Sequence, residues 1–254
     1  MIRQLLGKRN DSEVAPRVAA DARIYAVGDI HGRSDLLARL LDAIVADMAR
    51  FDDGRCAWLV FLGDYIDRGD ESATVLELLS DLAAEPAIDA VFLEGNHEAA
   101  LLRFLDDPRR GKDWIAFGGQ QTLASYGIKP PSDEDDAEAL ARIRDDLFFA
   151  LGHHLAFLRG LAPFARSGDV AFVHAAVDPR RAAPVAESRA LRWGHPDFLV
   201  PDPVPGLRIV HGHYDDGAPV VHPGRICVDT GAYYTGRLTA ARLDDDVAFL
   251  EVGP

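Results

Sequence analysis

The sequence contains few cysteines and no long apolar run. Cys56 and Cys227 are the only two cysteines among 254 residues, and each lies within an apolar run. We therefore expect two buried core residues of a reducing compartment, because two thiols are too few for a thiolate metal site. No run approaches the roughly 18 apolar residues of a membrane span, and the apolar patch in residues 1–9 is too short for a signal peptide. These absences predict a soluble cytoplasmic protein with no membrane partner.

Positive charge is also scarce. The 27 Lys and Arg residues against 41 Asp and Glu residues give a formal net charge of −14. This charge opposes the attraction to phosphate backbones on which most nucleic-acid-binding proteins depend, although a local metal cluster could still receive one anionic group. A nucleic-acid partner is therefore disfavoured. With 48% hydrophobic residues the chain can bury one sizeable core. We expect one domain over residues 23–254 after a flexible lead-in at 1–22.

Five short apolar runs each end in polar residues. Such runs predict buried strands, and open α/β sheets build their sites just beyond the carboxyl ends of strands. We therefore expect five turns to converge on one pocket. The runs occupy residues 24–27, 58–62, 90–93, 170–173 and 207–210.

The segments between these runs predict an α/β fold. Apolar residues at helical spacing follow the first two turns, so that strand, helix and strand alternate. Residues 99–165 then predict a helical cap that includes helices at 101–105 and 147–161 and a solvated acidic loop at 133–138. Strand patterns return after residue 170, and the last two, at 238–243 and 247–252, predict an antiparallel pair.

The five turns carry oxygen and nitrogen donors that suit Mn, Fe or Zn. Asp29 and His31 are alternate residues, so both can face one cation. Asp64 could bridge that cation to a second one. Two cations roughly 3.5–4 Å apart would hold a bridging hydroxide and clamp both oxygens of an in-line phosphoryl displacement. The six candidate ligands are Asp29, His31, Asp64, Asn96, His174 and His213.

Each of these residues also has an ordinary interpretation when taken alone. An Asp beside a Gly is usually a turn residue, and His174 could be a core histidine. The joint pattern of five turns favours the metal site. We expect His211 to support the site, and His153, His154 and His222 to lie at surfaces or helix ends.

The turns resemble the ordered signature of the phosphoprotein phosphatase family within the calcineurin-like metallophosphoesterases. The matching motifs are GDIHG at 28–32, GDYIDRG at 63–69, GNHE at 95–98, VHA at 173–175 and HGH at 211–213. Further segments at 114–127, 228–232 and 236–239 resemble bacterial serine/threonine protein phosphatases and symmetrical diadenosine tetraphosphatases. The resemblance covers about residues 23–245 and implies a two-sheet αββα sandwich with a helical cap. Five motifs in the family's order make the signal specific.

The resemblance also implies a role for each site residue. Asp29, His31 and Asp64 would hold the first metal, and Asp64, Asn96, His174 and His213 the second, with manganese expected first. His97 would protonate the leaving oxygen, and Asp67 would orient it. Arg68 would bind the phosphoryl oxygens, and Asn96 also lies where substrate binds.

One position departs from the bacterial relatives, which often carry Trp-Ile-Arg with the arginine as a second phosphate clamp. Here the segment 191–196 places His195 at the matching position. We expect His195 to contact the phosphoryl group as a weaker partner than a guanidinium, with Arg192 as the alternative clamp.

Three functions remain open at this point. The first is a serine/threonine protein phosphatase, with phosphotyrosine also accessible, and the alternative is a dinucleoside polyphosphate hydrolase. A non-catalytic phosphate-binding module is disfavoured because His97 and every expected ligand are present. A nucleotide hydrolase needs an aromatic or basic wall for the base, which Phe117, Tyr126, Tyr233 and Tyr234 could furnish, although such residues more often serve packing. The oligomeric state is left open.

Overall fold

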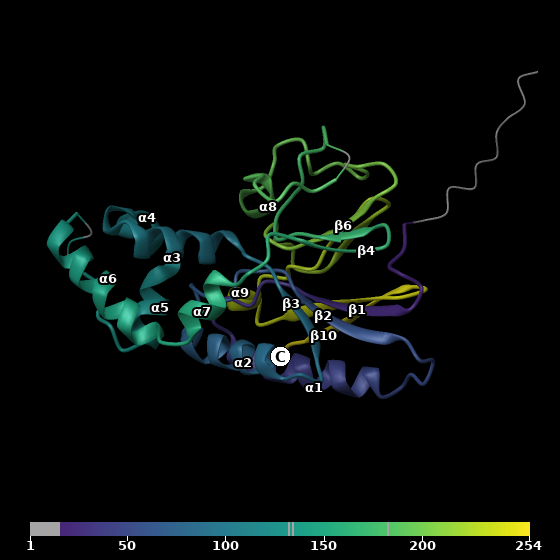
Figure 1. Ribbon diagram of the computed structural model, residues 1–254, viewed down its shortest axis with the longest axis horizontal. Helices are drawn as coiled ribbons and strands as arrows, with labels where there is room; N and C mark the ends of the chain where they lie inside the picture. Colours follow the sequence, from purple (N-terminus) through teal and green to yellow (C-terminus); the bar gives the residue numbers. More distant parts are fainter. Residues whose placement is uncertain (1–15, 132, 134, 182) are drawn as a thin grey trace, which may run out of the picture.

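Two five-stranded sheets packed face to face form the centre of the protein (Figure 1). The computed structural model describes residues 16–131, 133, 135–181 and 183–254. The first sheet has the order β10-β9-β1-β2-β3, and the second has the order β4-β5-β6-β8-β7. The first contains β1 (Ala22–Val27), β2 (Cys56–Phe61), β3 (Asp89–Phe92), β9 (Leu238–Leu243) and β10 (Val247–Val252). The second contains β4 (Ala165–Ser167), β5 (Val170–Phe172), β6 (Arg208–His211), β7 (Val220–His222) and β8 (Arg225–Cys227).

Strand direction places the site-bearing turns at one edge of the two sheets. β1, β2 and β3 run parallel, as do β5, β6 and β8. Buried side chains of β1 and β2, such as Ile24 and Val60, pack between the sheets against Phe172 and Val210 of the second sheet. The carboxyl ends of the parallel strands are thereby fixed relative to one another.

Helices cover the outer face of the first sheet. α1 (Ser34–Met48) and α2 (Ser72–Ala84) lie below it in Figure 1 and pack apolar faces onto its core. The outer face of the second sheet is covered by the mostly irregular stretches 177–181 and 183–207. Within the second stretch Phe198 is buried and α8 (Ala190–Trp193) is helical. The short helix α9 (Ala232–Thr235) follows β8.

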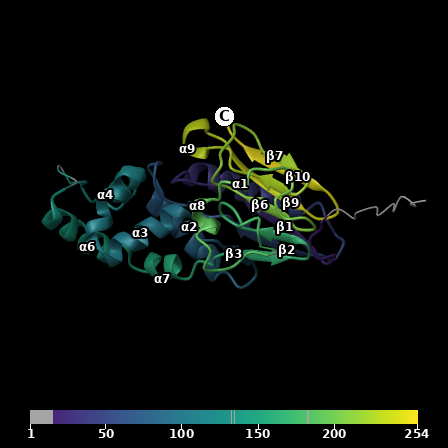
Figure 2. The ribbon, with the colours of Figure 1, turned by 90° about the horizontal axis from the view of Figure 1, so that it is seen from above.

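A helical segment projects from one side of the sheets in both views (Figures 1 and 2). It contains α3 (Asn96–Asp106), α4 (Gly111–Trp114), α5 (Gln120–Ser125), α6 (Ala137–Leu151) and α7 (His154–Arg159), with a 3-10 turn at Pro108–Arg110 and a π turn at Ile115–Gly119. The prediction of one helix over 147–161 was wrong. Gly152 has a φ of 52°, a left-handed conformation that separates α6 from α7.

The two-sheet α/β fold and the antiparallel pair of β9 and β10 are confirmed. The three-residue strands β4 and β7 were not predicted. The expectation that both cysteines are buried was wrong for Cys56, which is exposed because the first half of β2 is only partly covered, whereas Cys227 is buried. Among the described residues, no helix is long and apolar enough to cross a membrane.

Residues 1–15 of the expected lead-in lie outside the described residues. The part that is described packs against the second sheet, because Val18 is buried and the Arg17 carbonyl accepts a hydrogen bond from Asp169 N.

Candidate metal centre

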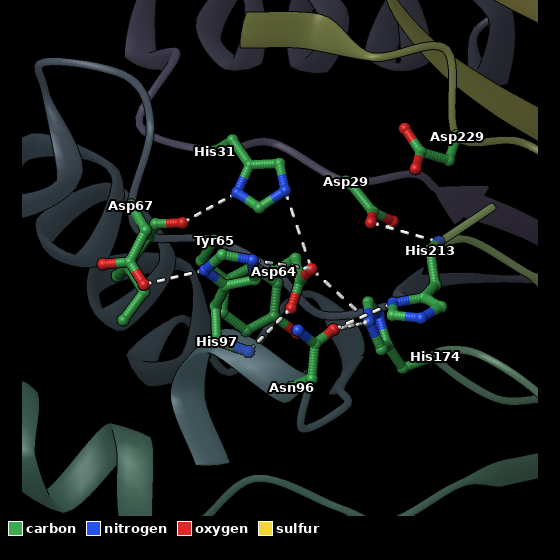
Figure 3. A network of polar contacts seen from close by, with 12 residues as sticks. Asp29, His31, Asp64, Tyr65, Asp67, Asn96, His97, His174, His213 and Asp229 are labelled. Atoms are coloured by element: carbon green, nitrogen blue, oxygen red, sulfur yellow. Dashed lines mark hydrogen bonds and ion pairs between the residues drawn. The ribbon is translucent and has the colours of Figure 1, made fainter. Parts of the chain in front are cut away.

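The five turns bring the six predicted ligands together beyond the ends of the strands, as Figure 3 shows. Asp29 and His31 follow β1, Asp64 follows β2, and Asn96 starts α3 immediately after β3. His174 and His213 follow β5 and β6 in the second sheet. All of these side chains are buried except that of His213, which is half-buried.

Asp64 stands at the centre of this group. Its Oδ2 atom lies 3.6 Å from His31 Nε2 and 3.4 Å from His174 Nε2. Donor atoms of His31, Asp64 and His97 lie within 4.8 Å of one another, as do those of Asp64, His174 and His213. Asp64 therefore belongs to both groups, the position that a bridging carboxylate needs.

Asn96 joins the second group. Its Oδ1 atom lies 2.9 Å from His174 Nε2 and 2.9 Å from His213 Nδ1. The backbone allows this close assembly because Gly95 has no side chain, and a Cβ there would lie 2.1 Å from Asp64 Oδ1.

Two of the histidines are oriented by backbone carbonyls so that Nε2 faces the centre. The Nδ1 atom of His31 is 2.8 Å from the Ile66 carbonyl, and that of His174 is 3.0 Å from the Leu62 carbonyl. A carbonyl accepts the Nδ1–H and leaves the Nε2 lone pair pointing to Asp64. Burial lowers the pKa of His31 to about 3 and that of His174 to about 4, so both rings are neutral at pH 7.

Asp29 lies at the margin of the centre and belongs to neither donor group. Its Oδ2 atom accepts a hydrogen bond from His213 N at 3.1 Å, and its buried Oδ1 atom has no partner among the described residues. Burial, together with the charges of Asp229 and Asp64, raises the pKa of Asp29. Asp229, which had no role in the sequence-based hypothesis, is buried beside it, and burial raises the pKa of Asp229 to about 7.

These residues fit a pair of divalent cations. Neutral imidazoles and carboxylates are the protonation forms that bind metals, and clustered buried carboxylates need compensating positive charge. The unpartnered Asp29 Oδ1 atom is one group that a cation would satisfy.

Backbone strain is concentrated at the same place. Five non-glycine residues have a positive φ in the described part of the chain, and all five are residues that the sequence predicted for the site. Left-handed conformations cost energy outside glycine and are retained mainly where function requires them. The residues are His31, Asp64, Asp67, Arg68 and His213, with φ between 45° and 70°.

The two ring nitrogens of His97 differ in their hydrogen bonding. Its Nδ1 atom lies 2.8 Å from Asp67 Oδ2, while its buried Nε2 atom has no hydrogen-bond partner among the described residues. Asp67 is in turn fixed by Thr122 Oγ1 at 2.6 Å and Trp114 Nε1 at 3.0 Å. Burial lowers the pKa of His97, but the charge of Asp64 and the hydrogen bond to Asp67 outweigh it, so the net pKa is raised.

Comparison with known proteins identifies the family. The model of calcineurin-like phosphoesterases matches residues 22–214. The chain belongs to this family. A symmetrical bis(5'-nucleosyl)-tetraphosphatase of Methylococcus capsulatus is 30% identical over 268 residues, which cover 87% of this chain and 91% of that protein.

Two solved structures share the fold. A candidate diadenosine tetraphosphatase has a TM-score of 0.58 at 21% identity, over 94% of this chain and 98% of that chain. A cold-active protein-tyrosine phosphatase of a psychrophilic Shewanella species has a TM-score of 0.52 at 17% identity, over 92% of this chain and 83% of that chain. The family predicted from the five turns is confirmed, and the protein is a metal-dependent phosphoester hydrolase.

In this phosphoesterase Arg68 lies close to the metal centre, where, in addition to burial, its positive charge acts to lower the pKa of His31 and of His213. Its backbone N–H donates to the Gly118 carbonyl at 3.2 Å, and its guanidinium lies 5.0 Å from the centroid of the Tyr233 ring. Gly118 has a φ of 110°, and a Cβ there would lie 2.9 Å from Arg68. A glycine is therefore required for the helical segment to approach Arg68 this closely.

His195 lies apart from the donor groups. Its Nε2 atom is 3.7 Å from Asp178 Oδ1, and its backbone N–H donates to the Tyr214 hydroxyl at 3.2 Å. The alternative clamp, Arg192, pairs with Glu94 at the end of β3. A role for His195 in phosphate binding stays a prediction.

Glu98 is a supporting residue to which the sequence assigned no role. Its fully buried carboxylate accepts hydrogen bonds from four N–H groups, those of Asp64 at 2.9 Å, Tyr65 at 2.8 Å, Ile66 at 3.3 Å and Gly95 at 3.0 Å. Burial and the charge of Asp64 raise the pKa of Glu98 to about 8, although these N–H groups act in the opposite direction. One side chain thus joins the turns after β2 and β3.

The other histidines have separate surroundings. His211 is buried with its ring 5.1 Å from that of Phe198, and its Nδ1 atom lies 2.9 Å from the Gly212 carbonyl. His154 is buried between Tyr126 and Glu77, whereas the His153 side chain is exposed.

Proposed function

We propose that this phosphoesterase hydrolyses symmetrical dinucleoside tetraphosphates into two nucleoside diphosphates. The observation that carries this proposal is the similarity to the Methylococcus tetraphosphatase, which extends over most of both chains. The sequence alone placed a protein phosphatase first, but the relationship to the Shewanella tyrosine phosphatase is one of fold only. The alternative is therefore better supported than the first hypothesis.

The proposal assigns Asp29, His31 and Asp64 to one divalent cation, and Asp64, Asn96, His174 and His213 to a second. When bound, such a pair neutralises phosphate charge and lowers the pKa of water to supply a nucleophile near neutral pH. Manganese is the first expectation, and iron or zinc is compatible with the same donors.

The remaining site residues would act on the phosphate chain. Arg68 presents a planar guanidinium that can bind two phosphoryl oxygens. His97 would donate its proton from Nε2, and Asp67, hydrogen-bonded to Nδ1, would hold the ring in that orientation. Trp114 and Thr122 would position Asp67 through their hydrogen bonds to its carboxylate.

The reaction balances with one water molecule. The water oxygen bonds to one of the two central phosphorus atoms as the bond from that atom to the bridging oxygen breaks. The bridging oxygen leaves with the other nucleoside diphosphate and takes a proton from His97. The attacking water gives up one proton to solvent, and a proton from solvent restores His97.

A side-by-side rate measurement tests the proposed substrate. The Mn-loaded protein should hydrolyse diadenosine tetraphosphate to ADP with a kcat/KM at least about tenfold above that for any member of a phosphoserine, phosphothreonine and phosphotyrosine peptide panel. A preference for the phosphopeptides, or products other than ADP, would contradict the proposed tetraphosphatase and make the protein phosphatase the preferred hypothesis.

A further inference from the structure

Six aromatic rings form a continuous row across the metal centre. In order they are Trp193, Phe117, His97, His31, Tyr233 and Tyr234. The successive ring centroids are 6.0, 6.0, 4.7, 5.5 and 5.0 Å apart. The two histidines of the centre occupy the middle of the row, and a pair of larger rings extends it on each side.

The first pair borders a cavity of about 670 Å³ beside the helical segment. Phe117 lies on the π turn before α5, and Trp193 ends α8. The guanidinium groups of Arg103 and Arg189 contact the Trp193 ring, at 5.6 and 5.3 Å from its centroid. Arg103 and Arg110 also line the cavity, together with the carboxylates of Asp106, Asp107 and Asp113.

The second pair is presented by α9. Gly231 and Gly236, with φ of 65° and 70°, bound this four-residue helix. The Tyr234 hydroxyl donates to the Asp215 carboxylate, which fixes the outer ring. Both tyrosines border a cavity of about 370 Å³ that Arg33 and Arg39 also line.

Three of the four outer rings are exposed, whereas Trp193 is partly buried. Phe117, Tyr233 and Tyr234 are 43%, 38% and 55% exposed. Exposure alone is not sufficient evidence, because Phe149 on α6 is 82% exposed without any described ring contact to the centre. What sets the two pairs apart is that each contacts a histidine of the centre and borders a cavity with two arginines.

We propose that the two ring pairs are nucleoside subsites on opposite sides of the metal centre. One base of a dinucleoside tetraphosphate packs against Phe117 and Trp193, and the other against Tyr233 and Tyr234. Arg68, which contacts Gly118 next to the first pair and Tyr233 in the second, lies between the subsites, where the central phosphates pass. This inference rests on the proposed function, because hydrolysis at the middle of a symmetrical substrate requires a nucleoside on each side of the reacting phosphorus.

The subsites also explain how the central bond is selected. Phosphate groups along the chain resemble one another, so a metal centre alone has little basis for choosing among them. Two bases held at similar distances from the centre fix the register of the chain.

Substitution of the outer ring of each pair tests the subsites. Trp193→Ala and Tyr234→Ala should each raise the KM for diadenosine tetraphosphate by about 5- to 100-fold more than the KM for inorganic tripolyphosphate, the range expected for loss of a base–aromatic contact. Phe149→Ala, an exposed aromatic on α6, is the matched control and should change neither value. Trp193→Leu and Tyr234→Leu keep apolar volume and serve where an alanine variant fails to fold.

Equilibrium binding gives a second readout that does not depend on turnover. The metal-loaded wild-type protein should bind ADP about 5- to 100-fold more tightly than inorganic pyrophosphate, and the double variant Trp193→Ala, Tyr234→Ala should bring that ratio to about one. Equal wild-type affinities, or equal effects of the variants on the nucleotide and inorganic ligands, would overturn the subsites.

The two proposals fail in different ways. A wild-type protein that cleaves the tetraphosphate while its variants show no nucleoside-specific loss contradicts the subsites alone. A wild-type protein that does not cleave it contradicts the proposed function, and the ADP-to-pyrophosphate ratio still decides whether the rings bind a nucleoside.

Discussion

At the scale of single residues, His97 shows how the fold can prepare a proton donor. Asp67 fixes one ring nitrogen, and Trp114 and Thr122 fix Asp67, so the bare Nε2 atom has one defined direction. Yet Nε2 lies 3.9 Å from Asp64 Oδ2, and His97 shares a donor group with His31 and Asp64. The same geometry would therefore also suit a metal ligand, and an experiment has to distinguish the two roles of His97.

Substitution of His97 by Asn should distinguish a proton donor from a metal ligand. We expect His97→Asn to retain both metals and to slow the hydrolysis of phenyl phosphate by about 10²–10⁴-fold, because a poor leaving group needs the proton. The activated p-nitrophenyl phosphate should lose less. Initial rates on both esters, with metal content by elemental analysis, check this; loss of one metal ion or an equal loss on both esters would contradict the acid role.

At the scale of elements, the contact between α2 and α7 depends on a buried histidine. His154 lies 2.9 Å from the Glu77 carboxylate through Nε2 and 2.6 Å from the Tyr126 hydroxyl through Nδ1. Burial lowers the pKa of His154 in spite of the carboxylate, so the folded protein holds the neutral ring. The unfolded chain then binds this proton more readily than the folded one.

That difference makes stability depend on pH. Stability contributed by the neutral ring is present above the pKa of an unfolded histidine, near 6.5, and is lost as the pH falls below it. His154→Gln should therefore reduce the decrease in Tm between pH 7.5 and pH 5. His222→Gln, on β7 of the second sheet, is the control, and thermal melts of metal-free protein exclude metal loss. Equal pH dependence in wild type and His154→Gln would rule out this contribution.

The elements also show what the sequence could predict. The strands that carry the site were readable because each is a short apolar run followed by glycine and polar residues. β4 and β7 were missed because each is only partly buried and lacks a run of three apolar residues, whereas β5 and β8, which are equally short, are fully buried. The break between α6 and α7 depends on one left-handed glycine inside an otherwise helical pattern.

The site residues also divide into those that the sequence could predict and those that it could not. Asp64, Asn96, His174 and His213 stand at strand ends, so their assembly could be expected from topology. The hydrogen bonds of Glu98 depend on where four N–H groups from two turns point, and the position of Asp229 beside Asp29 depends on packing between the sheets. Neither relation is visible in the order of residues.

At the scale of the whole molecule, the two sheets act together to form one centre. The first sheet supplies Asp29, His31, Asp64 and Asn96, and the second supplies His174 and His213. The centre therefore exists only when the sheets are packed in their observed register. The central claim is that this junction holds two divalent cations, with Asp64 shared between them.

Anomalous diffraction from crystals soaked in Mn²⁺ after treatment with a chelator tests that claim most directly. We predict two peaks on either side of Asp64, roughly 3.5–4 Å apart, together with loss of hydrolysis in the chelated protein and its recovery with the metal. A single peak, peaks away from Asp64, or full hydrolysis by protein shown to be metal-free would contradict it.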